Sequence, residues 1–124
     1  MLTLVFLLRR RPELAADEFH RYWRERHAPL VAGCAATLGI TRYTQLHSLD
    51  APLGEALRAS RGCEPNEYDG VALVTFDSVD TLVAAASTPE GREAGARLLE
   101  DERRFLDLER CVIWLADDVP IVEG

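Results

Sequence analysis

A stretch of fifteen residues, DEFHRYWRERHAPLV at positions 17–31, concentrates side chains that can move a proton. It holds His20 and His27 among two large aromatic residues and a proline. Imidazole titrates near physiological pH, which makes histidine the usual general acid or base of enzymes. On a helix, the seven-residue spacing separates the two rings by roughly 10.5 Å along the axis. Metal ligands on one helix are three or four residues apart, so the pair does not predict a metal site.

His27 is the stronger candidate of the two because of its position. At about 100° per residue, one apolar stripe of this helix holds four residues that should pack on a sheet: Phe19, Tyr22, Trp23 and Leu30. His27 borders that stripe and precedes Pro29 by two residues. Proline disfavours helix at the residue before it, so we expect the helix to kink or end at Ala28. His27 would then lie at the rim of the domain. It would either take part in chemistry there or simply be favourable for stability, as a histidine is at a helix C-terminus.

A second group of polar residues lies in the segment ITRYTQLHS, whose composition is typical of a strand. Alternation puts Tyr43, Gln45 and His47 on one face of it, opposite Ile40 and Leu46. The apolar side suits the helices, so the polar row is predicted to face away from them, into a cavity. Converging polar groups in an apolar cavity are typical of a small-molecule site. The alternative is an edge strand whose polar row faces water.

These two patterns predict a site with acid–base chemistry. The catalytic candidates are His27, His47 and Tyr43, and the substrate-binding candidates are Gln45, Trp23, Tyr22 and Phe6. Either histidine would remove an acidic proton from an aromatic or enolisable substrate, while Tyr43 and Gln45 would hydrogen-bond the developing oxyanion. Asp101 is a further candidate, as the partner that orients a histidine. The helical pattern favours instead an exposed Asp101 carboxylate paired with Arg97 or Arg104.

The elements that must position these residues follow a simple order. Strands are predicted at 2–9, 40–47, 69–77 and 110–117, with helices in 17–31 and in 78–109. Ser78 or Asp77 and then Thr88 are expected to cap the later helices. The order β-α-β-β-α-β predicts an α+β, ferredoxin-like domain with an antiparallel sheet. Residues 1–124 form one domain, with an insertion at about 49–68 that includes a short helix.

The sheet itself predicts a partner. The first, third and fourth strands are apolar at odd and even positions alike, so both faces need a cover. Right-handed crossovers put both helices on one face. We therefore expect a second copy on the other face, giving a two-fold homodimer. The alternative cover is the insertion, folded back over the sheet.

Composition excludes several other classes of protein. The chain has 14 Lys and Arg against 21 Asp and Glu, a net charge of −7, which argues against nucleic acid and anionic membranes as partners. Its three cysteines lack a CxxC spacing, so neither a disulfide framework nor a zinc knuckle is expected, and a reducing cytoplasm is the expected location. The apolar run near the N-terminus is shorter than the roughly 20 residues that span a bilayer.

Three motifs in this order resemble the EthD family: F19-x3-W23-x3-H27-x-P29, RYTQLH at 42–47 and DERRFLD at 101–107. The resemblance implies a dimeric α+β barrel, in which two ferredoxin-like sheets close face to face around a cavity. It also implies small-molecule chemistry of an oxidoreductase-associated kind, in ether degradation, polyketide tailoring or other catabolism. Related barrels include cofactor-free monooxygenases, polyketide cyclases and lactone isomerases.

Two functions therefore remain open from the sequence. One is a cofactor-free enzyme, a monooxygenase, cyclase or isomerase, that acts on a small hydrophobic or aromatic molecule. The other is a non-catalytic accessory or binding protein for a hydrophobic metabolite. Some related barrels bind haem, which makes haem the one cofactor to consider beside none at all.

Overall fold

The computed structural model describes residues 1–124 and contains one antiparallel sheet with the strand order β2-β3-β1-β4. The strands are β1 (Leu2–Leu8), β2 (Arg42–His47), β3 (Gly70–Phe76) and β4 (Val112–Asp117). All four lie within the predicted segments. The fold is the predicted α+β, ferredoxin-like arrangement. Strand β1 lies between β3 and β4 and pairs with both of them in antiparallel fashion.

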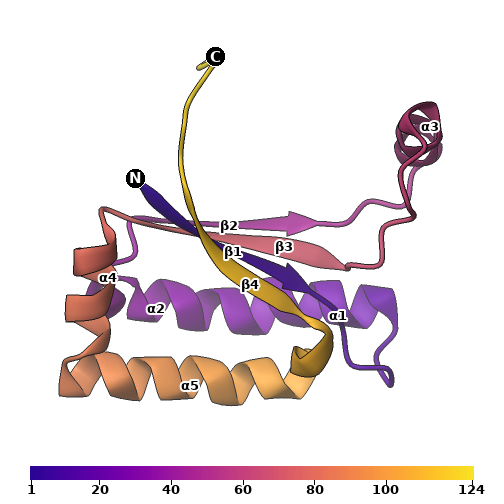
Figure 1. Ribbon diagram of the computed structural model, residues 1–124. Coiled ribbons are helices and arrows are strands. Elements are labelled where there is room, and N and C mark those ends of the chain that lie inside the picture. The colour runs from indigo at the N-terminus through magenta and orange to yellow at the C-terminus, as the bar shows by residue number, and fades with distance from the viewer.

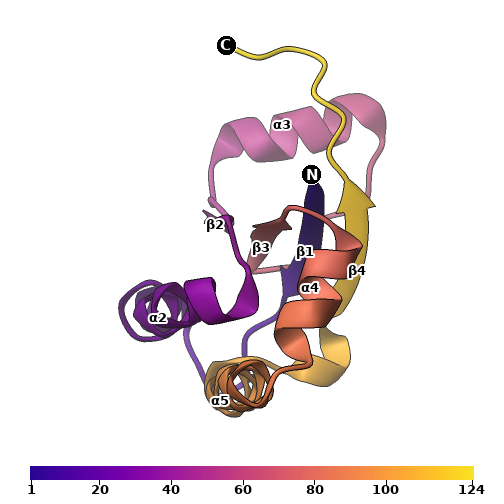
Figure 2. The ribbon, with the colours of Figure 1, turned by 90° about the vertical axis from the view of Figure 1, so that its left-hand side faces the viewer.

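All the helices except the one in the insertion lie on one side of this sheet. In chain order the helices are α1 (Ala16–Tyr22), α2 (Ala28–Leu38), α3 (Pro52–Arg61), α4 (Val79–Ala86) and α5 (Pro89–Phe105). Figures 1 and 2 show α2 and α5 beneath the sheet, with α3 and the C-terminal segment on the opposite side. A single 3-10 turn, Leu108–Arg110, leads from α5 into β4. None of the helices combines the length and the apolar composition that a membrane-spanning segment needs.

Local capping explains where the later helices begin. The Ser78 hydroxyl accepts a hydrogen bond from the Thr81 amide at 3.1 Å, and the Thr88 hydroxyl accepts one from the Gly91 amide at 2.9 Å. Both bonds satisfy amides that a helix start leaves unpaired, as the sequence predicted. The residue before helix α1 is Ala15, which has no side-chain acceptor. There the Glu18 carboxylate accepts the Ala15 amide at 3.0 Å instead.

Of the two outcomes predicted from Pro29, a kink or an end of the helix at Ala28, the helix does not end there. A π-helical turn, Trp23–His27, joins α1 to α2, and the Ala28 amide donates to the Trp23 carbonyl five residues earlier. The wider turn accommodates a proline, whose ring and missing N–H disturb a regular α-helix. Pro29 therefore falls in the first turn of α2, where a missing N–H does no harm. His27 lies inside a continuous helix rather than at its end.

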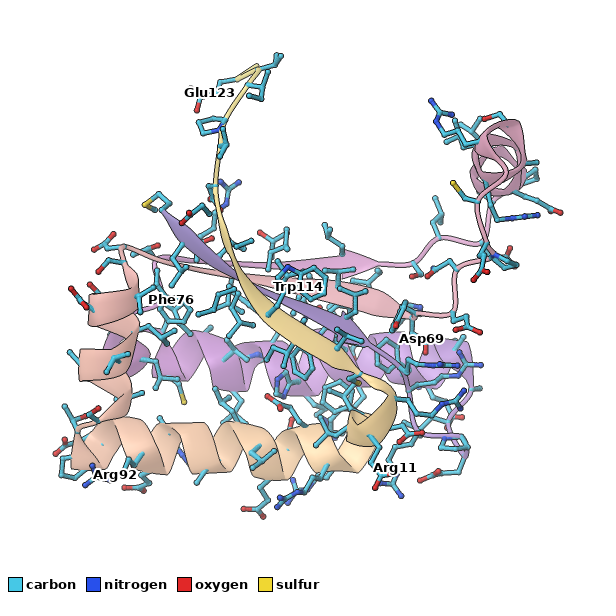
Figure 3. The ribbon with its side chains drawn as sticks, in the orientation of Figure 1. Arg11, Asp69, Phe76, Arg92, Trp114 and Glu123 are labelled. Carbon is cyan, nitrogen blue, oxygen red and sulfur yellow. The ribbon has the colours of Figure 1, made fainter.

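The open sheet face, defined here by Val5, Leu7, Leu46, Leu73, Val112 and Trp114, follows from the strand register. Leu46 is 47% exposed, Trp114 45% and Val112 42%. The insertion does not cover these residues, because α3 has no buried residue and lies beyond the ends of β2 and β3 (Figure 1). Figure 3 shows the C-terminal segment near Glu123 running away from the sheet on this side. The chain therefore leaves one apolar sheet face without a cover.

The close contact between Gly70 and Trp23 yields a prediction for stability. A Cβ added at Gly70 would lie 2.5 Å from the Trp23 ring and 2.9 Å from the Leu46 carbonyl. We expect Gly70→Ala to lower the free energy of unfolding by about 1–3 kcal/mol, because the core cannot absorb the extra carbon. Gly33→Ala is the matched control, since it meets nothing within 4 Å inside α2 and should raise stability by about 0.5–1 kcal/mol. Urea unfolding of both variants measures the difference, and equal effects would contradict the contact.

Candidate active site

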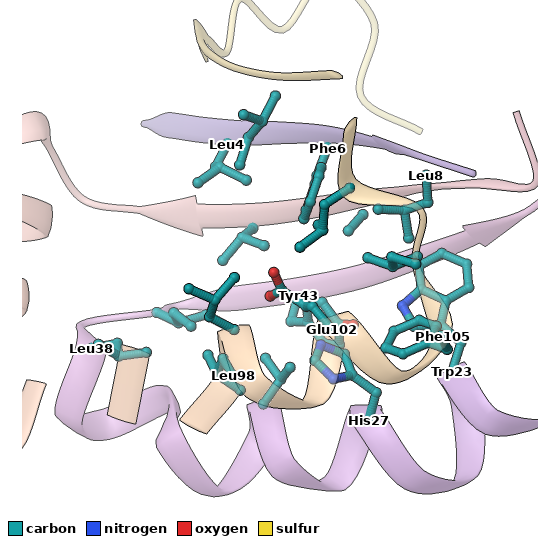
Figure 4. Close-up of a pocket in the computed structure, with 18 of the residues that line it drawn as sticks. Leu4, Phe6, Leu8, Trp23, His27, Leu38, Tyr43, Leu98, Glu102 and Phe105 are labelled. Carbon is teal, nitrogen blue, oxygen red and sulfur yellow. The ribbon is translucent and has the colours of Figure 1, made fainter. Parts of the chain in front are cut away.

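A cavity of about 410 Å³ lies between the helix-facing side of the sheet and helices α2 and α5 (Figure 4). Of the 20 residues that line it, 18 are hydrophobic, and the other two are His27 and Glu102. Phe6 and Trp23, two of the predicted substrate-binding residues, are part of its wall. A pocket of this size and polarity suits a small hydrophobic ligand that a few polar groups orient.

His27 enters this cavity from the π-helical turn, and Asp101 holds it from behind. Its Nδ1 lies 2.7 Å from the Asp101 Oδ2, and both side chains are buried. The other ring nitrogen, Nε2, has no hydrogen-bond partner in the chain. Every buried side-chain N or O atom has such a partner, so Nε2 is not fully buried and is accessible from the cavity. Burial lowers the pKa of His27, against the opposing effect of Asp101. His27 is therefore a neutral base whose Nδ1–H donates to the carboxylate.

Asp101 is itself held by three donors. Besides His27, the Tyr22 hydroxyl donates to its Oδ1 at 2.7 Å, and an Arg104 nitrogen lies 3.5 Å from the same oxygen. Asp101 is only 7% exposed, so the expectation of an exposed helical carboxylate was wrong, although its Arg104 contact is present. Tyr22 orients this carboxylate and does not line the cavity, contrary to its predicted place.

Glu102 brings a second titratable group into the cavity. It belongs to α5, and Figure 4 shows its side chain and the His27 ring beneath the sheet among the lining residues. Burial, with a smaller contribution from the neighbouring Asp101 charge, raises the pKa of Glu102 to about 7. A carboxyl group with this pKa can hold or release a proton at neutral pH. The cavity thus contains a neutral base and a protonatable acid.

The polar row of β2 faces the helices, not the open sheet face. Tyr43 lines the cavity, Gln45 contacts the Trp23 carbonyl, and Leu46 is exposed on the opposite face. The predicted orientation of the polar row was wrong, because it assumed from hydrophobicity alone that Leu46 packs against the helices. Tyr43 and His27 thereby line one cavity, which lies within the chain and not between two sheets.

His47 lies outside the cavity and joins a chain of hydrogen bonds. Its Nε2 is 2.8 Å from the Gln45 Oε1, and its Nδ1 is 2.7 Å from the His20 Nδ1. The structure thus gives His47 no access to a ligand in the cavity. No group of three His, Cys, Asp or Glu side chains is arranged to hold a metal ion.

Sequence reasoning missed Glu102, although a signal was present. Helix α5 turns Leu98, Asp101 and Phe105 toward the core, at spacings of three and four residues. Glu102 follows Leu98 by four and precedes Phe105 by three, so it lies on the same apolar stripe. A carboxyl group on an apolar stripe is costly to bury, so its presence there indicates a functional role inside the domain.

Comparison with known proteins places this site in context. Residues 11–109 match the EthD domain family. The chain is 25% identical to the dehydratase UstZ of Ustilaginoidea virens, with 98% of this chain and 86% of that protein aligned. It is 24% identical to the decarboxylase ClaH of Passalora fulva, with 99% and 83% aligned.

Solved structures show the same fold. An EthD-family protein of Bacillus halodurans superposes with a TM-score of 0.64 at 18% identity, over 96% of this chain and 99% of that one. A ferredoxin-like protein of Bacteroides fragilis, described as dimeric and of unknown function, gives a TM-score of 0.59 at 11% identity, over 94% and 95%. Dimers therefore occur among proteins of this fold.

The raised pKa of Glu102 predicts how stability depends on pH. The unfolded chain releases this proton near the ordinary pKa of 4.5 and the folded chain near 7, so the wild type loses stability as pH rises through that interval. Glu102→Gln removes this loss. Its free energy of unfolding should therefore exceed the wild-type value by an amount that grows by about 2–3 kcal/mol from pH 4.5 to above 7.

Urea unfolding at a series of pH values measures this dependence. Glu100→Gln is the matched control, because Glu100 lies on the solvent side of the same helix beside Arg104. A Glu102→Gln effect that does not change with pH would show that the carboxyl group is solvated.

Proposed function

This chain belongs to the EthD family, and on that premise we propose that it is a cofactor-free lyase that removes water from a hydrophobic β-hydroxy ketone. One observation carries the proposal: a neutral histidine held by a buried carboxylate and a carboxyl group with a pKa of about 7 line the same apolar cavity. Elimination of water requires such a pair, one group to take a proton and one to give a proton.

The reaction begins at the carbon next to the ketone. His27 Nε2 takes the acidic C–H proton, and the electron pair of that bond moves toward the carbonyl oxygen. The electrons then return to form the C=C bond as the C–O bond of the β-hydroxyl group breaks. Protonated Glu102 gives its proton to the departing oxygen, which leaves as water. Proton return from His27 to Glu102, through solvent, restores both groups, so no oxidant or cofactor is consumed.

The surroundings of His27 favour this role. The carboxylate of Asp101 accepts from Nδ1–H, which holds the ring in the tautomer with a free lone pair on Nε2. When His27 takes the proton, the same carboxylate stabilises the imidazolium that forms. The apolar wall limits water around the reacting atoms, which strengthens the interactions of these groups with developing charge.

The names of the relatives support elimination over oxidation. Both curated relatives are named as lyase-type enzymes, a dehydratase and a decarboxylase. The cavity has no Lys or Arg among its lining residues to neutralise a substrate carboxylate, which favours loss of water over loss of carbon dioxide. The proposal therefore replaces the oxidoreductase-type outcome expected from the family resemblance with acid–base elimination.

We also propose that the working unit is a homodimer. The open sheet face is apolar and unoccupied by any part of the chain, and it includes an indole ring that is 45% exposed. Contiguous apolar surface of this kind is typical of a protein interface. Dimeric proteins of the same fold support a second copy as its cover. Each protomer would keep its own cavity on the helix side of its sheet.

A defined β-hydroxy ketone tests the activity. 3-Hydroxy-1-tetralone loses water to give an enone that becomes 1-naphthol by tautomerisation, so fluorescence reports the reaction. We expect the wild type to accelerate 1-naphthol formation, and expect His27→Ala and Glu102→Gln each to lower kcat/KM by about 10²–10⁴-fold. Glu100→Gln is the control on the solvent side of α5 and should keep the wild-type rate.

Two results would contradict this function. Equal rates for wild type and His27→Ala would remove the base from the reaction. Saturable binding of 3-hydroxy-1-tetralone without any acceleration over buffer would support a binding protein instead.

The dimer is tested by size-exclusion chromatography with light scattering. The 13.8 kDa chain should elute at twice its mass, and Trp114→Glu should shift it to one chain mass because a charge replaces a buried ring at the interface. Glu123→Ala, at the far end of the C-terminal segment, is the control. A wild-type monomer at micromolar concentration would contradict the proposal.

A further inference from the structure

The orientation of the Gln45 amide is fixed by a backbone group. The Trp23 carbonyl, at the start of the π-helical turn, can only accept hydrogen bonds, and the Gln45 Nε2 lies 2.9 Å from it. A reversed amide would place two oxygens against each other. The NH₂ group of Gln45 therefore faces the helix, and its second hydrogen is directed at the Tyr43 hydroxyl oxygen, 3.0 Å away.

The hydrogen bonds from His20 to Gln45 run in the same donor-to-acceptor direction. The Gln45 Oε1 must accept, so the His47 Nε2, 2.8 Å from it, carries the proton. In a neutral ring the His47 Nδ1 then accepts from the His20 Nδ1–H at 2.7 Å. Burial lowers the pKa of both histidines, which keeps them neutral at neutral pH. Every bond from His20 to Tyr43 thus runs in one direction.

These hydrogen bonds end at the hydroxyl group of Tyr43, a residue that lines the cavity. Its oxygen accepts from Gln45, and the hydroxyl group donates in none of the side-chain hydrogen bonds of the structure. We infer that Gln45 is a positioning residue that makes Tyr43 a hydrogen-bond donor to the substrate, so that the site selects molecules with a carbonyl oxygen at this position. This inference rests on the proposed function and specifies which end of the substrate lies at β2.

A hydrogen bond from Tyr43 would also determine the orientation of the substrate in the cavity. The carbonyl oxygen would lie at Tyr43, where a donor stabilises the negative charge that develops during proton removal. Burial raises the pKa of Tyr43, so the hydroxyl keeps its proton for this purpose. His27 and Glu102 are then left for the neighbouring carbon and the departing hydroxyl group. A ligand of the same shape without a carbonyl group would leave the Tyr43 hydrogen without an acceptor.

Two unreactive ligands test the inference. 1-Tetralone and tetralin have the same bicyclic frame and differ by one carbonyl group, and neither can lose water. Calorimetric titration gives the affinity ratio of ketone to hydrocarbon for each protein variant. We expect Tyr43→Phe to lower this ratio by about three- to tenfold relative to the wild type, which is the size of one lost neutral hydrogen bond. An unchanged ratio would overturn the inference.

Gln45→Glu separates positioning from simple packing. The carboxylate has nearly the same shape but can only accept, so the Tyr43 hydrogen would turn toward it and away from the cavity. The affinity ratio of 1-tetralone to tetralin should fall as it does in Tyr43→Phe. The infrared carbonyl band of bound 1-tetralone should move to higher frequency in both variants. Tyr68→Phe, outside the cavity, is the control and should leave ratio and band unchanged. A wild-type band at the Gln45→Glu frequency would overturn the positioning role.

The tautomer of His47 gives a readout without any ligand. Nitrogen-15 NMR at about pH 8 should find the proton on Nε2 and a free lone pair on Nδ1. The opposite tautomer would mean a reversed Gln45 amide and would overturn the inference. Failure of the dehydration assay with an intact ketone preference would reject only the proposed reaction, whereas dehydration without ketone preference would reject only the Tyr43 donor.

Discussion

The buried contact between His27 and Asp101 is the interaction on which the rest of the site depends. A carboxylate that is 7% exposed must be surrounded by donors, and the chain supplies an imidazole and a phenol from the first helix and a guanidinium from its own helix. These contacts join α1 and the π-helical turn to α5. They also fix the rotation of α5, which directs the next residue, Glu102, into the cavity.

One physical effect, removal from water, gives the two titratable groups opposite roles. Burial disfavours the charged form of any group, so it lowers the pKa of His27 and raises that of Glu102. The base is therefore unprotonated and the acid partly protonated in the same range of pH. Divergence of this kind is typical of acid–base pairs in enzymes. The hydrophobic wall thus both accepts the substrate and adjusts the groups that act on it.

The π-helical turn links the fold to this chemistry in a second way. Its Trp23 carbonyl accepts from the Ala28 amide and from the Gln45 side chain, so one backbone group ties the helix layer to β2. Such turns often occur at functional sites. Here the turn keeps Pro29 within a continuous helix, places His27 under the sheet and orients the amide beside Tyr43.

Hydrophobic periodicity was enough to predict the four strands, the capped helices and the uncovered sheet face, because these depend on local pattern. Which face of β2 packs against the helices could not be predicted in this way. Its exposed face carries Leu46, and its inner face carries Gln45, whose amide donates to a carbonyl from a helix 22 residues earlier. Asp101 was misplaced for a similar reason, since its burial depends on His27, 74 residues away. Polar contacts between distant segments leave no periodic signal.

The role of His27 as the base depends on its protonation state, which nitrogen-15 NMR of histidine across pH 4–9 measures. We expect a single tautomer at neutral pH, with the proton on Nδ1 and a free lone pair on Nε2, and a pKa below the ordinary value of 6.5. A His27 ring that carries both protons at pH 7, or one with its proton on Nε2, would contradict a neutral base held by Asp101.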